Sequence, residues 1–396
     1  MTISVLDAER DRRGLEAFLA LPSRVYEGDP NYCASGRDAV VASLRRREFA
    51  GRQLALVAVE GNGGARPLAR PFARPIARLV ARLSPALADP ASGRPYGLLG
   101  FFEAIPGEAG AEAAGMLFAA AAAWLRGRGA GAIVGPMDGD TWHRYRLNAG
   151  PWDEPPFLLE PYNLPGYPAL WQANGFRVLA SYSSRRIDDA AAVAEHLGIH
   201  RRQALAAGYR LRPLDARRFS RELGLLHELS CAIFAENFLY TEIPRAEFAA
   251  VYAGARPLID PELVWFAETG RGEPAGFLFA YPDHFRAVAS MRGGRGPLAR
   301  LRCLRELRRG RPAAVNFKTV GVLREHRRAG LGAALVAQGY DTALRKGFRS
   351  SNHCLILEGN PSAALDAGRG RLLRRYHLYQ LAGGADPAGS IGRGAA

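Results

Sequence analysis

The stretch Arg327-Arg328-Ala329-Gly330-Leu331-Gly332 lies where an apolar strand gives way to a helix. The strand is predicted for Ala314 to Leu323, which is rich in β-branched and aromatic residues. The helix is predicted from the glycines to Arg345, because apolar residues then recur at spacings of four. The first N–H groups of a helix have no partner within it, and glycine lets a ligand approach closely. The stretch therefore predicts a loop that binds a phosphate or pyrophosphate.

The same spacing occurs a second time, at Arg126-Gly127-Arg128-Gly129-Ala130-Gly131. Here it follows a helix predicted for Glu108 to Arg126 and precedes a short apolar run. Glycines directly after a helix are typical of a C-terminal cap. We interpret this second match as a turn and not as an anion site.

The first match is part of a longer pattern that resembles a known family. The strand, the R-x-x-G-x-G loop, the helix, the next strand Ser351 to Leu357 and the following Glu358-Gly359-Asn360 resemble the acyl-CoA core of the GCN5-related N-acetyltransferase (GNAT) superfamily. Further segments resemble a group of large bacterial GNAT-like proteins with two GNAT-type halves; they are residues 19–30, 100–103, 135–136 and 160–163. The resemblance implies an α/β fold with a mixed sheet, and acetyl-CoA or another acyl-CoA as cosubstrate.

The length of the chain also indicates two domains, because 396 residues exceed what one hydrophobic core usually organises. We predict two tandem GNAT-like domains, at residues 1–190 and 207–396, with a linker helix near Ala190 to Ala206. In the first half, Glu103 and Glu108 stand where a GNAT domain carries its phosphate loop. Carboxylates repel a pyrophosphate, so we expect CoA to bind to the second half.

Composition narrows the class of protein. No uninterrupted apolar segment reaches the roughly 20 residues that span a bilayer, and the N-terminus lacks the basic and apolar regions of a signal peptide. The four cysteines are far apart, without a C-x-x-C spacing. This favours reduced thiols in a cytoplasmic protein without a metal site.

The formal net charge of +15 predicts attraction to polyanions, which include CoA, an acidic acyl carrier protein, RNA and anionic lipid. Two segments concentrate the arginines, Arg66 to Pro75 and Met291 to Arg311, and the second contains a predicted basic helix from Leu298 to Arg309. Each segment is interpreted either as a solvated surface or as a specific polyanion site, and the sequence leaves both open.

The GNAT resemblance implies direct attack of an amine on the thioester carbonyl. By motif position, the N–H of Val322 would face that carbonyl, and Asn360 would either contact the cofactor or cap the next helix. Glu358 is the nearest acid that could act as the base, with a chain of waters as the alternative. Tyr376 and Tyr379 are the candidates for protonating the departing thiolate.

The acceptor site is predicted beside Asn237 and Tyr240, which lie between the first two helices of the second half. A second cluster of polar side chains follows a strand of the first half and includes Trp142, His143 and Arg144. Loops often carry binding groups, but a hydrogen-bond network between the domains explains this cluster equally well.

The sequence therefore favours an acyl-CoA-dependent N-acyltransferase that acts on a small amine or an amino-acid-like acceptor. Two alternatives stay open. The basic surface would also suit a transferase whose donor is a carrier protein or an aminoacyl-tRNA. The missing standard base would also suit a CoA-binding protein without catalysis.

Overall fold

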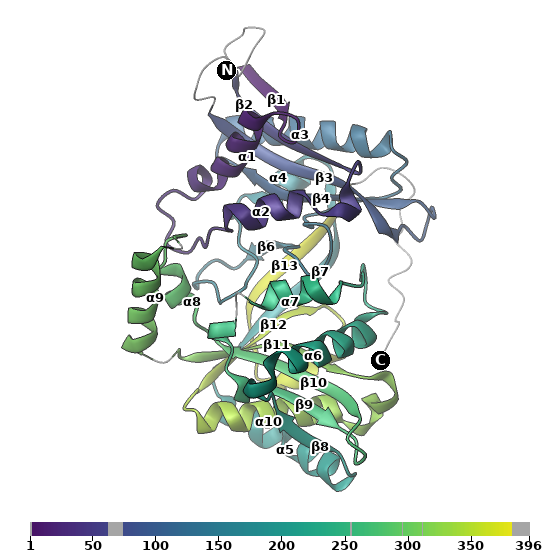
Figure 1. The fold of residues 1–396 in the computed structure, drawn as a ribbon, viewed down its shortest axis with the longest axis vertical. Helices are drawn as coiled ribbons and strands as arrows, with labels where there is room; N and C mark the ends of the chain where they lie inside the picture. The colour runs from purple at the N-terminus through teal and green to yellow at the C-terminus, as the bar shows by residue number, and fades with distance from the viewer. Residues whose placement is uncertain (1, 62–73, 254–255, 295, 311, 382–396) are drawn as a thin grey trace.

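The computed structural model describes residues 2–61, 74–253, 256–294, 296–310 and 312–381 (Figure 1). The strands are β1 (Thr2–Asp7), β2 (Gln53–Gly61), β3 (Pro75–Ala88), β4 (Pro95–Ala104), β5 (Ile133–Gly135), β6 (Leu147–Gly150), β7 (Phe176–Ile187), β8 (Arg210–Pro213), β9 (Val264–Glu268), β10 (Pro274–Pro282), β11 (Ala314–Val322), β12 (Ser350–Leu357) and β13 (Arg371–Leu381). The helices are α1 (Arg12–Val25), α2 (Arg37–Leu44), α3 (Glu108–Arg126), α4 (Tyr167–Ala173), α5 (Ala190–Ala206), α6 (Phe219–Phe234), α7 (Arg245–Ala253), α8 (Phe285–Ala289), α9 (Pro297–Arg309) and α10 (Leu331–Arg345).

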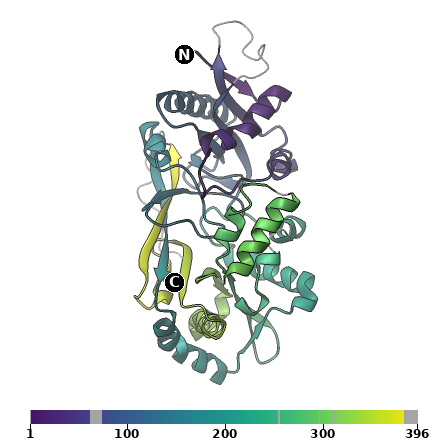
Figure 2. The same ribbon diagram turned by 90° about the vertical axis from the view of Figure 1, so that its left-hand side faces the viewer.

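In the described residues the strands form one mixed sheet that runs through the long axis of the molecule (Figures 1 and 2). Its order is β1-β2-β3-β4-β5-β13-β7-β12-β11-β10-β9-β8, and β6 pairs with β13 beside this path. The two ends consist of antiparallel strands. Parallel pairs occur once in each half, between β4 and β5 and between β11 and β12. The predicted mixed α/β fold is therefore confirmed.

The two halves exchange strands at the middle of this sheet. The last strand, β13, lies between β5 and β7 of the first half, where Tyr379 pairs with Gly135 and Tyr376 with Tyr182. On its other side, β7 pairs with β12, so that Leu357 faces Tyr182. Hydrogen bonds thus join the halves, while the sequence boundaries at residues 190 and 207 stay a prediction.

Helix α5 differs from the linker that the sequence suggested. Its apolar residues Val193 and Leu197 belong to the same buried core as Leu335 and Tyr340 of α10, and the two helices pack against each other. The spacing of four that defines a core-facing stripe was present in the sequence. The helix is a structural part of the second half.

Helices cover the sheet in both halves of the chain. In the first half α3 packs on β3 and β4 with a stripe that contains Leu117, Ala121 and Leu125. In the second half α5 and α10 cover one side, and α6 and α7 belong to a separate core with β9 and β10. No helix among the described residues is long and apolar enough to cross a membrane. The Arg- and Pro-rich segment lies largely outside the described residues, since residues 62–73 are not among them.

Candidate active site

The parallel strands β11 and β12 separate before they end. They pair only from Ala314 to Phe317, opposite Ser350 to His353, although both strands continue. At the same place β11 has a bulge toward β10, because Phe279 pairs with Thr319 and Ala280 with Phe317. Lys318 is the extra residue. A bulge bends its strand and frees a residue from the ladder, so a notch opens in the sheet at Lys318.

A cavity of about 670 Å³ lies at this notch and takes residues from both halves. The second half supplies its apolar walls with Phe234, Phe238, Leu258, Ile259 and Phe279. The first half closes it with the loop Thr141 to Arg146. Binding cavities are concave and largely apolar, with a few polar groups that orient the ligand, and this cavity has that composition.

The predicted phosphate loop has the expected backbone geometry. The chain passes through a six-residue 3-10 helix, η6 (Arg324–Ala329), and then through Gly330, whose φ of 65° is left-handed. Helix α10 begins at Leu331, and no side chain caps it. The first N–H groups of α10, at Leu331 and Gly332, could thus donate hydrogen bonds to an anion at the positive end of the helix dipole.

The arginines of this loop have different positions. The Arg327 side chain turns back toward the fold, where Nε donates to the Val322 carbonyl at 3.3 Å and a terminal nitrogen donates to the Ile233 carbonyl at 3.5 Å. It therefore fixes the loop to β11 and α6. Arg328 and Ala329 are exposed at the tip of the loop.

Two other predicted cofactor contacts lie near the cavity. Val322 is buried and pairs with Gly276 of β10, while Val320, two residues earlier, lines the cavity. Asn360 also lines it, and its side-chain oxygen accepts the N–H of Ser362 at 2.9 Å. This bond caps the following 3-10 helix, η7 (Pro361–Asp366). The capping role is therefore present in the structure, and cofactor contact stays a prediction.

The three predicted catalytic side chains do not line the cavity. The Glu358 side chain is 54% exposed and lies 3.9 Å from Arg375. Tyr376 is fully buried and donates to Glu160 and, at 3.1 Å, to Ser184. Tyr379 is buried in the first-half core, and its hydroxyl has no hydrogen-bond partner among the described residues. The roles assigned to them stay untested predictions, without support from their positions.

The two predicted acceptor regions, by contrast, come together. Asn237 and Tyr240 line the cavity, as do Trp142, His143 and Arg144 from the first half. The Trp142 indole N–H donates to the Thr241 carbonyl at 2.7 Å, and its ring lies edge-on to Tyr240 at 5.9 Å. The loop therefore joins the two halves and forms a wall of the cavity, while its role in binding an acceptor stays a prediction.

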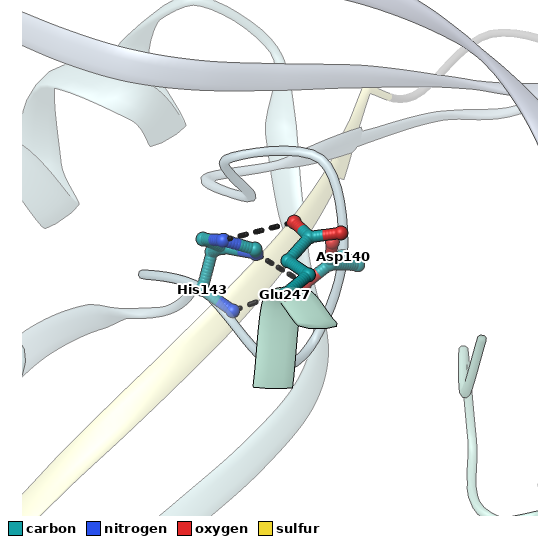
Figure 3. Close-up of side chains that lie close together, drawn as sticks. All are labelled: Asp140, His143 and Glu247. Carbon is teal, nitrogen blue, oxygen red and sulfur yellow. Dashed lines mark hydrogen bonds and ion pairs between the residues drawn. The ribbon is translucent and has the colours of Figure 1, made fainter. Parts of the chain in front are cut away.

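His143 belongs to a cluster that has the residue types of a metal site. Asp140, His143 and Glu247 lie close together (Figure 3), with the His143 Nδ1 2.8 Å from Asp140 and Nε2 3.5 Å from Glu247. Arg46 already supplies a cation here, since its guanidinium lies 2.8 Å from Asp140 and 3.3 Å from Glu247. The chemistry of this set therefore fits an internal ion-pair network better than a metal ion.

Arg144 is held by a different buried network. It donates to Glu103 at 3.2 Å, and the other oxygen of Glu103 accepts from Tyr26 at 2.7 Å and from Tyr167 at 3.0 Å. The carboxylate raises the pKa of Arg144, although burial opposes it. Glu103, one of the two acids that the sequence placed at the missing phosphate loop, therefore has a structural partner.

Two cations that the sequence analysis did not select also line the cavity, Lys318 and Arg146. Burial, with a smaller contribution from the charge of Arg146, lowers the pKa of Lys318 to about 8. The Arg146 guanidinium lies between the rings of Tyr145 and Tyr182, at 3.8 and 3.9 Å from their centroids. The sequence does mark Lys318, because it is the one charged residue in the predicted strand Ala314 to Leu323.

This architecture is shared with known proteins. One solved structure with this fold is the glucosamine N-acetyltransferase region of a fungal GH3 β-N-acetylglucosaminidase, 15% identical, with a TM-score of 0.52 over 96% of this chain and 38% of that chain. A protein of Enterococcus faecalis described as a probable N-acyltransferase is 8% identical, with a TM-score of 0.52 over 96% of this chain and 72% of that one. The chain has the fold of a two-domain GNAT protein. The GNAT resemblance of the sequence is thereby confirmed for the fold.

Sequence comparison finds similarity at low identity. No protein-family model matches the chain. The bacterial ceramide synthase of Caulobacter vibrioides is 24% identical over 379 residues, which cover 93% of this chain and 94% of that protein. The similarity therefore extends over both halves of the chain.

Proposed function

We propose that this protein is an N-acyltransferase that moves an acyl group from a CoA thioester to the primary amine of an amphiphilic acceptor. The observation that carries the proposal is Lys318, a partly buried amine that lines the cavity at the notch between β11 and β12. Strand β11 leads from this notch to the predicted phosphate loop. A phosphate held at α10 would leave the rest of the donor to extend along the notch toward Lys318.

Acyl transfer needs a group that first takes a proton from the acceptor ammonium and later donates a proton to the departing thiolate. Neutral Lys318 takes a proton from the acceptor ammonium, and the freed amine attacks the thioester carbonyl. As the tetrahedral intermediate collapses, the C–S bond breaks and the Lys318 ammonium returns the proton to the thiolate. Lys318, neutral again, then takes the second proton from the nitrogen that becomes the amide and releases it to water. A pKa of about 8 leaves a useful neutral fraction near pH 7, and general bases work best when their pKa is near the working pH. Backbone N–H groups at the point where β11 and β12 separate would stabilise the oxyanion.

The acceptor class is supported by the walls of the cavity and by one relative. Phe234, Phe238 and Phe279 contribute aromatic surface, and Leu258 and Ile259 aliphatic surface. Such walls suit a long apolar chain better than a small polar amine. A ceramide is an N-acylated long-chain amino alcohol, so the similarity to a protein named bacterial ceramide synthase agrees with this chemistry.

The test is Lys318→Met together with Lys318→Arg. Both variants should lower kcat by roughly a hundredfold or more, the usual scale of general-base catalysis, because arginine keeps the charge but cannot take up a proton. Lys346→Met is the control, because Lys346 forms a half-buried salt bridge with Asp260 and does not line the cavity. The assay uses long-chain amino alcohols and fatty acyl-CoA, and follows thiol release between pH 6 and 10.

Wild-type kcat should rise with pH to a plateau above about pH 8, and this rise should disappear in Lys318→Met. Full turnover by Lys318→Arg would remove Lys318 as the base. Bound CoA without any turnover in the wild type would favour the non-catalytic alternative. Turnover that needs a carrier protein or an aminoacyl-tRNA would assign a different donor.

A further inference from the structure

Helix α9 exposes a row of leucines. Leu298 and Leu301 are each 62% exposed, and Leu304 is 49% exposed. Their spacing of three places them along one side of the helix. Helix α9 packs against α8 at the edge of the molecule (Figure 1). Ala299 is buried on the side opposite the leucines, so the helix is held to the fold with its leucines exposed. The row therefore has no role in the core of this chain.

The same outer surface is strongly basic. The helix contains five arginines and one acid, Glu306. Arg300, Arg305 and Arg308 are exposed around the leucine row, while Glu306 pairs with Arg309 at 2.8 Å. The helix thus presents apolar and cationic side chains together.

We propose that α9 docks the protein on the surface of a bilayer that contains anionic lipid. An interfacial helix buries apolar side chains at the boundary of the acyl chains and keeps its cations at the headgroups. Long arginine side chains reach the phosphates while their stems lie along the apolar layer. An RNA or an acidic protein would use the arginines but would leave three leucines in water, and it is therefore the less fitting partner.

The proposal of membrane docking by α9 and the proposed acyl transfer are based on different observations. The leucine row lies on α9, and none of its residues lines the cavity. Membrane docking would nevertheless bring a water-insoluble acceptor within reach. The docking experiment contains neither donor nor acceptor, so its result does not depend on acyl transfer.

The experiment measures flotation of the full-length protein with vesicles of phosphatidylcholine, with and without phosphatidylglycerol. One variant replaces the leucine row (Leu298→Ser, Leu301→Ser and Leu304→Ser). A second replaces arginines (Arg300→Gln, Arg305→Gln and Arg308→Gln). The control is Ile199→Ser with Leu205→Ser on α5, whose side chains are 45% and 49% exposed. Circular dichroism checks that each variant is folded.

The wild type and the control should bind vesicles that contain phosphatidylglycerol. The leucine variant should lose at least tenfold in partitioning. The arginine variant should lose about a hundredfold, since each arginine near an anionic surface contributes roughly a fivefold change. Binding that survives in the folded leucine variant but disappears in the arginine variant would show a plain polyanion surface and overturn the proposal. Tighter binding to polyuridylate than to vesicles, or no vesicle binding by the wild type, would overturn it as well.

Discussion

Helices α3 and α10 begin in corresponding places, each near a pair of parallel strands and each with a glycine in its first turn. A side chain at Gly110 of α3 would overlap the carbonyl oxygen of Ile105. A Cβ at Gly332 of α10 would lie 3.8 Å from the nearest Val322 methyl group, at ordinary contact distance. The first glycine allows backbone to pack closely on backbone, whereas the second leaves open space at a helix N-terminus.

The charges at the two helix starts differ in the same direction. Glu108 occupies the first turn of α3, and Glu103 is buried just before it. The first turn of α10 contains no acid. The first-half helix start is therefore closed and acidic, whereas the second-half start has space and no acid, as the predicted anion site requires. The following predictions test this difference.

The largest effect on stability is expected for Gly110→Ala. The new methyl group can be accommodated only by moving the backbone at Ile105, because the contact is with a carbonyl and not with a flexible side chain. We expect a loss of about 3 kcal/mol in the free energy of unfolding, at the upper end for overpacked sites. Urea denaturation would measure it. A variant as stable as the wild type would show that the first helix start is not closed.

Gly330→Asp should lower acetyl-CoA affinity by roughly a hundredfold, because it places a carboxylate at the predicted phosphate site. Gly330 has a φ of 65°, so backbone strain also contributes. Gly129→Asp is the matched control, because Gly129 has a φ of 83° and no heavy atom within 4 Å of a new Cβ. It carries the same strain in a turn where we expect no ligand.

Isothermal titration calorimetry measures the affinity of both variants, and thermal unfolding confirms that each is folded. Equal loss of affinity in the two variants would attribute the effect to strain or to charge in general. It would also remove the distinction between the two R-x-x-G-x-G segments.

Lys318→Met should stabilise the protein while it removes activity. Burial lowers the pKa of Lys318 from 10.5 to about 8, so the folded state binds fewer protons than the unfolded state between these values. Wild-type stability therefore rises as the pH rises from about 8 to about 10.5, and the full penalty applies below pH 8. Methionine avoids that penalty.

We expect Lys318→Met to raise the free energy of unfolding by about 1–3 kcal/mol at pH 7. This range allows for solvent in the cavity, which screens the charge of Lys318. The gain should shrink toward zero above pH 10.5. Thermal unfolding at several pH values would check this. A variant less stable than the wild type at pH 7 would indicate that Lys318 is held by favourable contacts, and would weaken its assignment as a neutral base.

The elements were largely predictable because their apolar spacing is regular. The bounds predicted for α3 are those observed, and the strand before the phosphate loop differs by one residue at its end. The exchange of β13 into the middle of the sheet was not predictable, because it depends on hydrogen bonds between segments more than 200 residues apart, as between Tyr379 and Gly135. Local pattern contains no information on such pairing.

The site was only partly predictable for a related reason. The loop before α10 has a local signature, and both acceptor regions reach the cavity. Proximity in sequence and residue type favour Glu358 as the base. A buried lysine becomes a base only through its surroundings, and Lys318 acquires them from the bulge in β11 and from Arg146 of the other half. Neither can be derived from the strand alone.

The smallest effect is expected for Gly332→Ala. Alanine favours a helix over glycine by up to about 1 kcal/mol, and the space near Val322 accepts the methyl group. Stability should therefore change by less than about 1 kcal/mol, in the stabilising direction, opposite to Gly110→Ala. Acetyl-CoA affinity should fall by only a few fold, because the methyl group narrows the approach to the N–H groups of α10 without adding charge. Calorimetry and urea denaturation measure both quantities on the same sample. A loss of stability as large as that of Gly110→Ala would mean that the second helix start is as closed as the first, and the comparison of the two halves would fail at its central point.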